Sequence, residues 1–163
     1  AIVRSLVGSE MCIRARLSDS DAIEFVPTTG KTRFTALASG EIDMLARNTT
    51  WTFSRDVDLK FEFVGVNYYD GQGFMAKADL GVSSATELDG ATVCIQTGTT
   101  TELNLADFFR ANNMSYEAVP VETGSEAVTN YLAGACDVFT TDRSALAARR
   151  ANFEVPTDHV VLP

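Results

Sequence analysis

The sequence predicts an α/β fold in which short strands alternate with helices, and three observations support this class. Short apolar runs such as ATVCIQ at residues 91–96 are typical of buried strands. Between such runs lie segments whose apolar residues recur at helical spacing, and which begin with T-x-x-E or end at a glycine. Neither a repeat nor a long linker interrupts the alternation from residue 22 onward. We therefore expect βαβ units with parallel strands.

The first part of the chain is predicted to hold one helix and four strands. The helix covers residues 31–39, because Phe34 and Leu37 lie at core spacing and Gly40 can end it. An Asp-Gly pair at residues 70–71 indicates a turn. Alternating or continuous apolar residues predict strands at 22–27, 42–46, 61–66 and 73–77.

The second part is predicted to hold four further strands and four helices. Thr99 with Glu102, and Thr123 with Glu126, have the spacing of capping boxes and so mark two helix starts. We place the boundary between two structural units near residues 75–79, where a strand gives way to a polar crossing. The helices are expected at 83–89, 99–112, 123–133 and 142–152, and the strands at 91–96, 116–121, 136–140 and 159–162.

Charge argues against several classes of partner. The 163 residues carry a formal net charge of −9, with a sequence pI of about 4.5. A chain this acidic repels nucleic acid and anionic membrane surfaces, so we expect neither as a partner, although the surplus acid could serve solubility alone. No apolar run reaches the roughly 18 residues of a membrane-spanning helix.

Residues 1–17 fit poorly with the rest of the chain. They are locally positive in an acidic protein and show neither helical nor strand periodicity. Part of the segment, RSLVGSEMCIRAR, resembles a translated sequencing adapter. We expect this segment to be either non-native sequence or the remnant of a first helix that ends near Leu17.

The first candidate site is the polar cluster RNTTWTFSRD at residues 47–56, which follows a predicted strand. Open α/β sheets place ligands beyond the carboxyl ends of their strands. Arg55 offers a fork of donors shaped for a carboxylate, Thr50 a hydroxyl, and Trp51 a flat apolar wall. A polar surface turn with one extended arginine would explain the same residues.

Two further candidate sites follow strands in the second part of the chain. At the junction 96–101, Gly98 permits a tight turn, and the first amides of the next helix, those of Thr100 and Thr101, could bind an anion. Asp142 ends the run TTD and could hold an ammonium group. An ordinary capped helix would explain the junction, and a role as N-cap would explain Asp142. Together, the three sites suit an α-amino acid bound as a zwitterion between two lobes.

We expect no catalytic site, no metal site and no cofactor. The only histidine, His159, would have to serve alone, and no two of the three cysteines have CxxC spacing. Cys94 and Cys136 lie in strand-like runs. They could remain buried thiols or, in an oxidising compartment, form a disulfide.

Four linked motifs carry a family resemblance: RFTALASGEIDMLARNTTWTFSRD, FVGVNYYDGQGF, IQTGTTTELNL and CDVFTTD. Over residues 18–163 the chain resembles the periplasmic amino-acid-binding proteins of ABC importers (solute-binding protein family 3), and most of all the general L-amino-acid-binding proteins. The resemblance implies the two-lobed type II periplasmic-binding-protein fold, here truncated at both ends. Residues 18–76 would form an incomplete first lobe and residues 77–163 a nearly complete second lobe.

The resemblance also implies roles for the candidate residues. In the first lobe, Thr50 and the backbone of Asn48 would contact the amino acid, and Arg55 would pair with its carboxylate. An aromatic ring, Trp51 or one of the Tyr68-Tyr69 pair, would line the side-chain pocket.

In the second lobe, the family's glycine-turn loop maps onto residues 97–101, which include Gly98 and Thr101, and Thr100 supplies a backbone amide. The acid that binds the ammonium group maps onto Asp142.

The function implied is that of a monomeric periplasmic protein that captures L-amino acids and passes them to ABC permease subunits at the inner membrane. It would use no cofactor and perform no chemistry. Two alternatives remain: a dehydratase-like enzyme on the same fold, or the ligand-sensing domain of a transcriptional regulator. A cytosolic regulator would keep Cys94 and Cys136 reduced.

Overall fold

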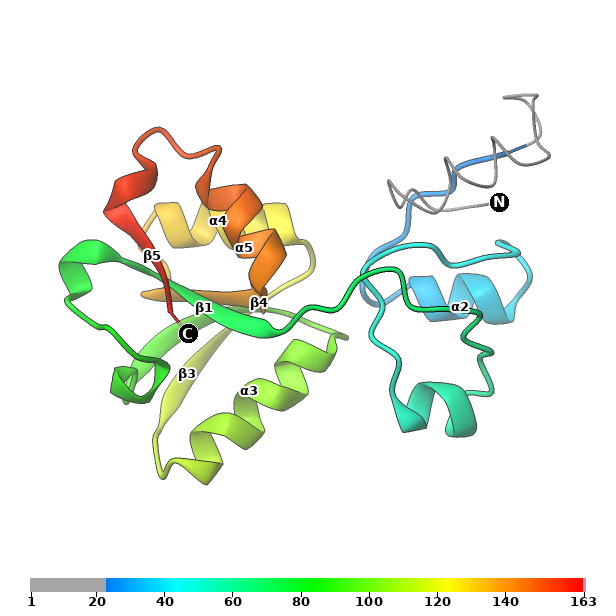
Figure 1. Cartoon of the computed structure of the whole chain (residues 1–163), viewed down its shortest axis with the longest axis horizontal. Helices are drawn as coiled ribbons and strands as arrows, with labels where there is room; N and C mark the ends of the chain where they lie inside the picture. Colours follow the sequence, from blue (N-terminus) through cyan, green and yellow to red (C-terminus); the bar gives the residue numbers. More distant parts are fainter. Residues whose placement is uncertain (1–22, 163) are drawn as a thin grey trace. The chain divides into compact units, whose positions relative to one another are not determined.

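The computed structural model describes residues 23–162, which are drawn in colour in Figure 1. The chain divides into two compact units, residues 1–69 and residues 70–163. The doubtful segment 1–17 lies outside the described residues. We expected the boundary near residues 75–79, and it falls earlier because the strand Gln72–Lys77 pairs with two strands of the second unit.

The second unit is built on one five-stranded sheet with the strand order β3-β2-β4-β1-β5. β2 runs parallel to both β3 and β4. β1 is antiparallel to both β4 and β5, so the expectation that all strands are parallel is wrong. The apolar pattern of a strand shows that the segment is buried but carries no information about its direction. The strands are β1 (Gln72–Lys77), β2 (Ala91–Gln96), β3 (Tyr116–Val121), β4 (Val138–Asp142) and β5 (His159–Leu162).

Helices cover both faces of this sheet. α3 (Thr100–Ala111) packs on one face, and α4 (Gly124–Leu132) and α5 (Arg143–Arg150) pack on the other (Figure 1). Successive strand residues point to opposite faces, so β1 sends Phe74 to the core under α3 and Met75 to the core under α4 and α5. Burying each large apolar side chain in these cores contributes about 1.5–3 kcal/mol.

Local sequence signals explain where these helices begin. The hydroxyl of Thr99 accepts a hydrogen bond from the Glu102 N–H, and the Glu102 carboxylate accepts one from the Gly98 N–H at 2.9 Å. The start of α4 repeats this arrangement with Thr123 and Glu126. Both helix N-termini that T-x-x-E predicts are therefore confirmed.

Two predicted elements of the second unit differ from the structure. The short helix predicted at 83–89 is a single 3₁₀ turn, Ala85–Glu87. The strand predicted at 136–140 lies instead at Val138–Asp142. Asp142 is therefore the last residue of a strand that is paired on both sides.

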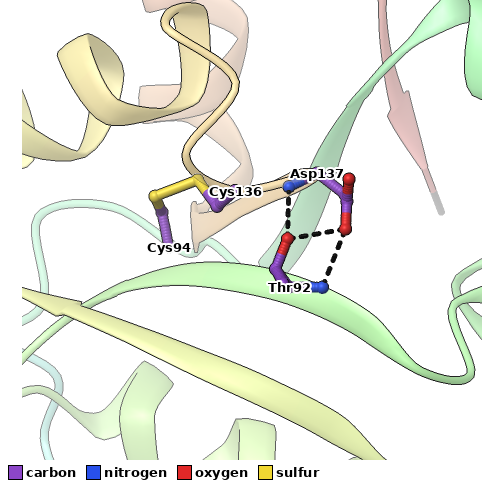
Figure 2. Close-up of a disulfide and its surroundings, with 4 residues drawn as sticks. All are labelled: Thr92, Cys94, Cys136 and Asp137. Atoms are coloured by element: carbon purple, nitrogen blue, oxygen red, sulfur yellow. Dashed lines mark hydrogen bonds between the residues drawn. A yellow bond between two sulfur atoms is a disulfide. The ribbon is translucent and has the colours of Figure 1, made fainter.

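A disulfide bond joins Cys94, in the middle of β2, to Cys136, just before β4, and both residues are buried (Figure 2). The next residue, Asp137, accepts hydrogen bonds from the N–H and the hydroxyl of Thr92, at 2.9 and 2.6 Å. Its own N–H donates to the Thr92 hydroxyl at 2.9 Å. The connection that enters β4 is therefore fastened to β2 by one covalent bond and a ring of polar contacts.

The first unit has little regular structure among its described residues. α2 (Arg33–Ala38) lies within the predicted helix, and a π-helical turn covers Ser54–Asp58. The strands predicted at 22–27, 42–46 and 61–66 are wrong, since residues 23–69 contain no strand and only Met44 makes an isolated bridge. An alternating pattern forms a strand only where another strand pairs with it, and the described part of this unit contains none.

None of the helices in residues 23–162 has both the length and the apolar composition that crossing a membrane requires.

Candidate ligand-binding site

Sheet topology gathers two of the three candidate sites at one edge of the second unit. β2 and β4 are parallel, so the loop at 97–101 and Asp142 leave the sheet at the same edge. β1 runs the opposite way and begins there, with Gln72 paired to Asp142 in register. The second unit therefore brings together the two groups that the sequence predicts as ligand contacts, the backbone amides of the loop at 97–101 and the carboxylate of Asp142.

Gln72 connects the two segments, and sequence reasoning missed it. Its Nε2 donates to the backbone oxygen of Thr101 at 3.1 Å and to the hydroxyl of Thr140 at 2.9 Å. The Thr140 hydroxyl in turn donates to the backbone oxygen of Gly73 at 2.8 Å. A signal was available: a polar residue opens the buried run 72–77 directly after an Asp-Gly turn.

Asp142 does not act as the side-chain cap of the helix that follows it. Its carboxylate makes no capping hydrogen bond to α5, so the interpretation of Asp142 as an N-cap acceptor is wrong. Asp70 takes that role, because its carboxylate accepts from the Ser144 N–H at 3.3 Å and from the Ser144 hydroxyl. It also accepts from the Gly71 N–H at 2.8 Å. Asp142 is half-buried at the end of β4, directly before α5.

The loop between β2 and α3 is already rich in internal contacts. The Thr99 hydroxyl donates to the backbone oxygen of Gln96 at 2.7 Å and lies 2.7 Å from the Thr101 hydroxyl. The Gly98 N–H points at the carboxylate of Glu102. A ligand anion at the start of α3 would therefore bind to a loop whose conformation is already fixed by internal hydrogen bonds. One of its amides, that of Gly98, already donates to Glu102.

In the first unit, Arg55 lies in the π-helical turn and is buried. Its Nη1 donates to the backbone oxygen of Thr50 at 2.8 Å, and its guanidinium carbon lies 4.9 Å from the centroid of the Phe34 ring. Burial lowers the pKa of Arg55 from its ordinary value. The ordinary value is so high that the group stays charged at neutral pH.

A second buried guanidinium, that of Arg33, lies over the same ring, 4.7 Å from its centroid. Its Nη1 donates to the backbone oxygen of Asn48 at 3.0 Å and to the Thr49 hydroxyl at 3.2 Å. Sequence reasoning identified this residue only as part of a helix. Two arginines thus hold the backbone of residues 48–50 and place positive charge beside the loop that we expected to bind a carboxylate.

The two aromatic candidates lie in different environments. Trp51 stacks on Phe63, with ring centroids 5.2 Å apart, and its indole N–H donates to Asp56 at 2.7 Å. Tyr69 is 89% exposed and is the last residue of the first unit. Their expected place in a side-chain pocket stays a prediction.

The comparisons with known proteins agree with the motifs, although no family model matches the chain. The glutamate/glutamine/aspartate/asparagine-binding protein BztA of Rhodobacter capsulatus is 61% identical over 149 residues, which are 91% of this chain and 44% of BztA. Over this stretch, the chain is similar in sequence to amino-acid-binding proteins of ABC transporters. A second such protein, the general L-amino acid-binding periplasmic protein AapJ of Rhizobium johnstonii, is 53% identical over 91% of this chain and 44% of AapJ.

The solved structures agree on the fold of this amino-acid-binding family. A periplasmic binding protein of an ABC transporter from Brucella ovis, solved with glutathione bound, is 52% identical with a TM-score of 0.84. The match covers 90% of this chain and 46% of that chain. The chain has part of the type II periplasmic-binding-protein fold, and it spans less than half the length of the relatives named here.

Proposed function

We propose that this chain carries amino-acid-binding residues of the substrate-binding component of an ABC importer. The observation that carries the proposal is the placement of Asp142. Asp142 ends β4 in register with Gln72, at the edge of the sheet where the loop that starts α3 also leaves it. A carboxylate at this edge, close in the fold to the first amides of α3, is suited to a ligand's ammonium group.

Proposed ligand contacts are found within each of the two units, taken separately. Asp142 pairs with the α-ammonium group, and the backbone amide of Thr100 binds a ligand oxygen. Arg55 pairs with the α-carboxylate, and Thr50 and the backbone of Asn48 contact the same main-chain groups. Each hydrogen bond to a charged group contributes about 1.5–3 kcal/mol. Recognition that rests on main-chain groups allows several side chains.

The names of the relatives guide the choice of ligand and partner. BztA is named for binding glutamate, glutamine, aspartate and asparagine, and AapJ for binding general L-amino acids. We infer that this chain takes polar L-amino acids among others and that its complete protein delivers them to a membrane permease from the periplasm. The disulfide supports this compartment, because structural disulfides persist where the surroundings are oxidising.

Calorimetry of this chain with a panel of L- and D-amino acids tests the proposal. We expect saturable binding of L-glutamate, L-glutamine, L-aspartate or L-asparagine, weaker binding of their D-forms, and recovery of the ligand unchanged. N-acetyl-L-glutamate and the α-amide of L-glutamate are matched probes, since one lacks the ammonium charge and the other the α-carboxylate. Both should bind much more weakly than L-glutamate. Equal binding of either analogue, or turnover of the ligand into product, would contradict the proposal.

A further inference from the structure

The half-buried side chain of Gln72 makes a direct connection between the loop that starts α3 and the end of β4. We propose that Gln72 is a positioning residue of the amino-acid site, which holds the start of α3 at a fixed distance from Asp142. This inference rests on the proposed function of the same edge of the sheet. Gln72 itself need not touch the ligand.

The orientation of the amide follows from the chemistry of its partners. The backbone oxygen of Thr101 can only accept, so the NH₂ end of Gln72 must face it. The hydroxyl of Thr140 spends its single proton on the backbone oxygen of Gly73, so it too accepts from Gln72. The two contacts together therefore require an atom with two N–H donors, and the amide nitrogen is the only atom of the Gln72 side chain that has them.

The other end of the amide shows that this contact has a cost. Within residues 23–162, the Oε1 of Gln72 is buried and has no hydrogen-bond partner. An unsatisfied buried acceptor destabilises the folded state. The amide therefore places two segments relative to each other at some expense in stability, which is a compromise typical of functional sites.

The segments that Gln72 joins are those with proposed ligand contacts. Thr101 directly follows Thr100, whose amide we propose as a donor to the ligand. Thr140 lies two residues before Asp142 on β4, and it shares the sheet face of Gln72, because Phe74 pairs with Thr140 and Gln72 pairs with Asp142. A shift of α3 along the sheet would therefore change the distance between the ligand's two proposed contacts in this unit.

Neither partner loses all its hydrogen bonds when Gln72 is replaced. Thr140 still donates to Gly73, and the Thr101 carbonyl still accepts from the helical N–H of Leu105. Gln72→Met is similar in length, removes the unsatisfied Oε1 and removes both donors. If Gln72 serves only stability, Gln72→Met should be less stable than the wild type. If Gln72 positions the loop, the variant should be as stable as the wild type, and the loop that starts α3 should be more mobile.

The experiment compares the wild type, Gln72→Met and Asn112→Asp. Asn112 is the matched control at the opposite end of α3, where its amide donates to the Phe108 backbone oxygen at 2.8 Å. Its replacement by an acid lowers stability through the helix dipole without touching the loop. Calorimetry measures affinity for L-glutamate, urea unfolding measures stability, and NMR hydrogen exchange follows the amides of Glu102 and Leu105.

For Gln72→Met, we expect exchange at these two amides to rise about tenfold and affinity to fall about tenfold, with the urea midpoint unchanged or higher. Asn112→Asp should lower the midpoint and leave the affinity as it is. Wild-type exchange or affinity in Gln72→Met would overturn the positioning role, as would a loss of affinity in proportion to lost stability in both variants. If the wild type itself binds no amino acid, the proposed function fails and the role of Gln72 in binding fails with it. Failure of the positioning role alone is recognised by intact binding in Gln72→Met.

Discussion

The guanidinium of Arg55 donates a hydrogen bond from Nη1 to the backbone oxygen of Thr50, 2.8 Å away. The cation that we propose for the ligand's carboxylate thus also holds the loop that precedes it in sequence. The ring of Phe34 supports the same group through a cation–π contact. A substitution at residue 55 changes the loop as well as the charge, so its test needs a variant for each.

Arg55→Lys and Arg55→Ala separate these two effects. Lysine keeps the positive charge but concentrates it on one ammonium group, without the planar fork of N–H donors that arginine has. Alanine removes both the charge and the donors. By calorimetry, we expect affinity for L-glutamate to fall about tenfold in Arg55→Lys and about a hundredfold in Arg55→Ala. Arg110→Ala is the control, because the side chain of Arg110 is 79% exposed and pairs with Asp107 on its own helix. Wild-type affinity in Arg55→Ala would mean that another group binds the carboxylate.

Asp142→Asn should abolish the pairing with the ammonium group and leave the fold intact. We expect affinity to fall about a hundredfold, since the amide retains the shape of the side chain but not its charge. The urea midpoint should change less than in Asp70→Ala, because Asp70, and not Asp142, caps the start of α5. Asp107→Asn, at an exposed position of α3, should change neither quantity. A large loss of stability in Asp142→Asn would show that its role is structural.

Asp70→Ala should lower the stability of the protein rather than its affinity for the ligand. Losing the carboxylate that caps α5 should lower the free energy of unfolding by about 1 kcal/mol. Partial burial raises the pKa of Asp70, but hydrogen bonds from Ser144 and Gly71 and the charge of Arg143 outweigh it, so the net shift is downward. A carboxyl whose pKa is lowered on folding stabilises the protein above its unfolded pKa, and this contribution is lost as the pH falls through the folded value. As the pH falls through the acid range, the free energy of unfolding measured in urea should therefore decrease less for Asp70→Ala than for the wild type.

Sequence reasoning predicted the elements of the second unit because several local signals agree there. Thr99 and Thr123 each cap a helix with an acid three residues on, and β2 and β4 each contain a run of three buried residues. These signals act within a few residues and are readable without the fold. Strand direction and the roles of Gln72 and Asp70 depend on pairing across tens of residues, so no local pattern could give them.

The first unit was predicted poorly for a related reason. Its apolar residues alternate as they would in strands, yet the described residues of this unit supply no strand to pair with. Its order comes instead from arginine side chains on carbonyl oxygens, such as Arg33 on Asn48 and Arg47 on Thr28. Periodicity does not encode contacts of this kind. The sequence singled out Arg55 because it stands in a cluster of polar residues, whereas Arg33 lies in an ordinary helical pattern that gives no such signal.

Breaking the disulfide between Cys94 and Cys136 should strongly destabilise the second unit. The bond spans a sequence separation of 42 residues, and closing a loop of that length in the unfolded chain stabilises the protein by about 4 kcal/mol. The double variant Cys94→Ala/Cys136→Ala should unfold at lower urea and lose sensitivity to reductant. Cys12→Ala is the control and should keep that sensitivity. Thiol titration of the unfolded, unreduced chain should find only Cys12 reactive, and further reactive thiols would contradict the pairing.

The single histidine should make stability depend on pH near neutrality. His159 is buried in β5, and its Nδ1 lies 2.8 Å from the hydroxyl of Tyr131. Burial raises the pKa of Tyr131, so its hydroxyl stays protonated and can donate to an unprotonated Nδ1. Burial also lowers the pKa of His159, with Lys77 adding to this effect and Asp158 opposing it. The folded protein therefore keeps the ring neutral at a pH where the unfolded chain would protonate it.

The sign of the effect follows from proton uptake. Between the lowered folded pKa and the unfolded value of about 6.5, the unfolded state binds more protons, so stability falls as the pH falls through this range. We expect the free energy of unfolding to drop by at most about 1.4 kcal/mol per pH unit on this account. His159→Gln keeps an acceptor for Tyr131 but cannot titrate, so its urea midpoint should vary less between about pH 5.5 and pH 7.5. Tyr131→Phe removes the donor and keeps the titrating ring, so the dependence should persist. An equal slope in His159→Gln and the wild type would assign it to other groups.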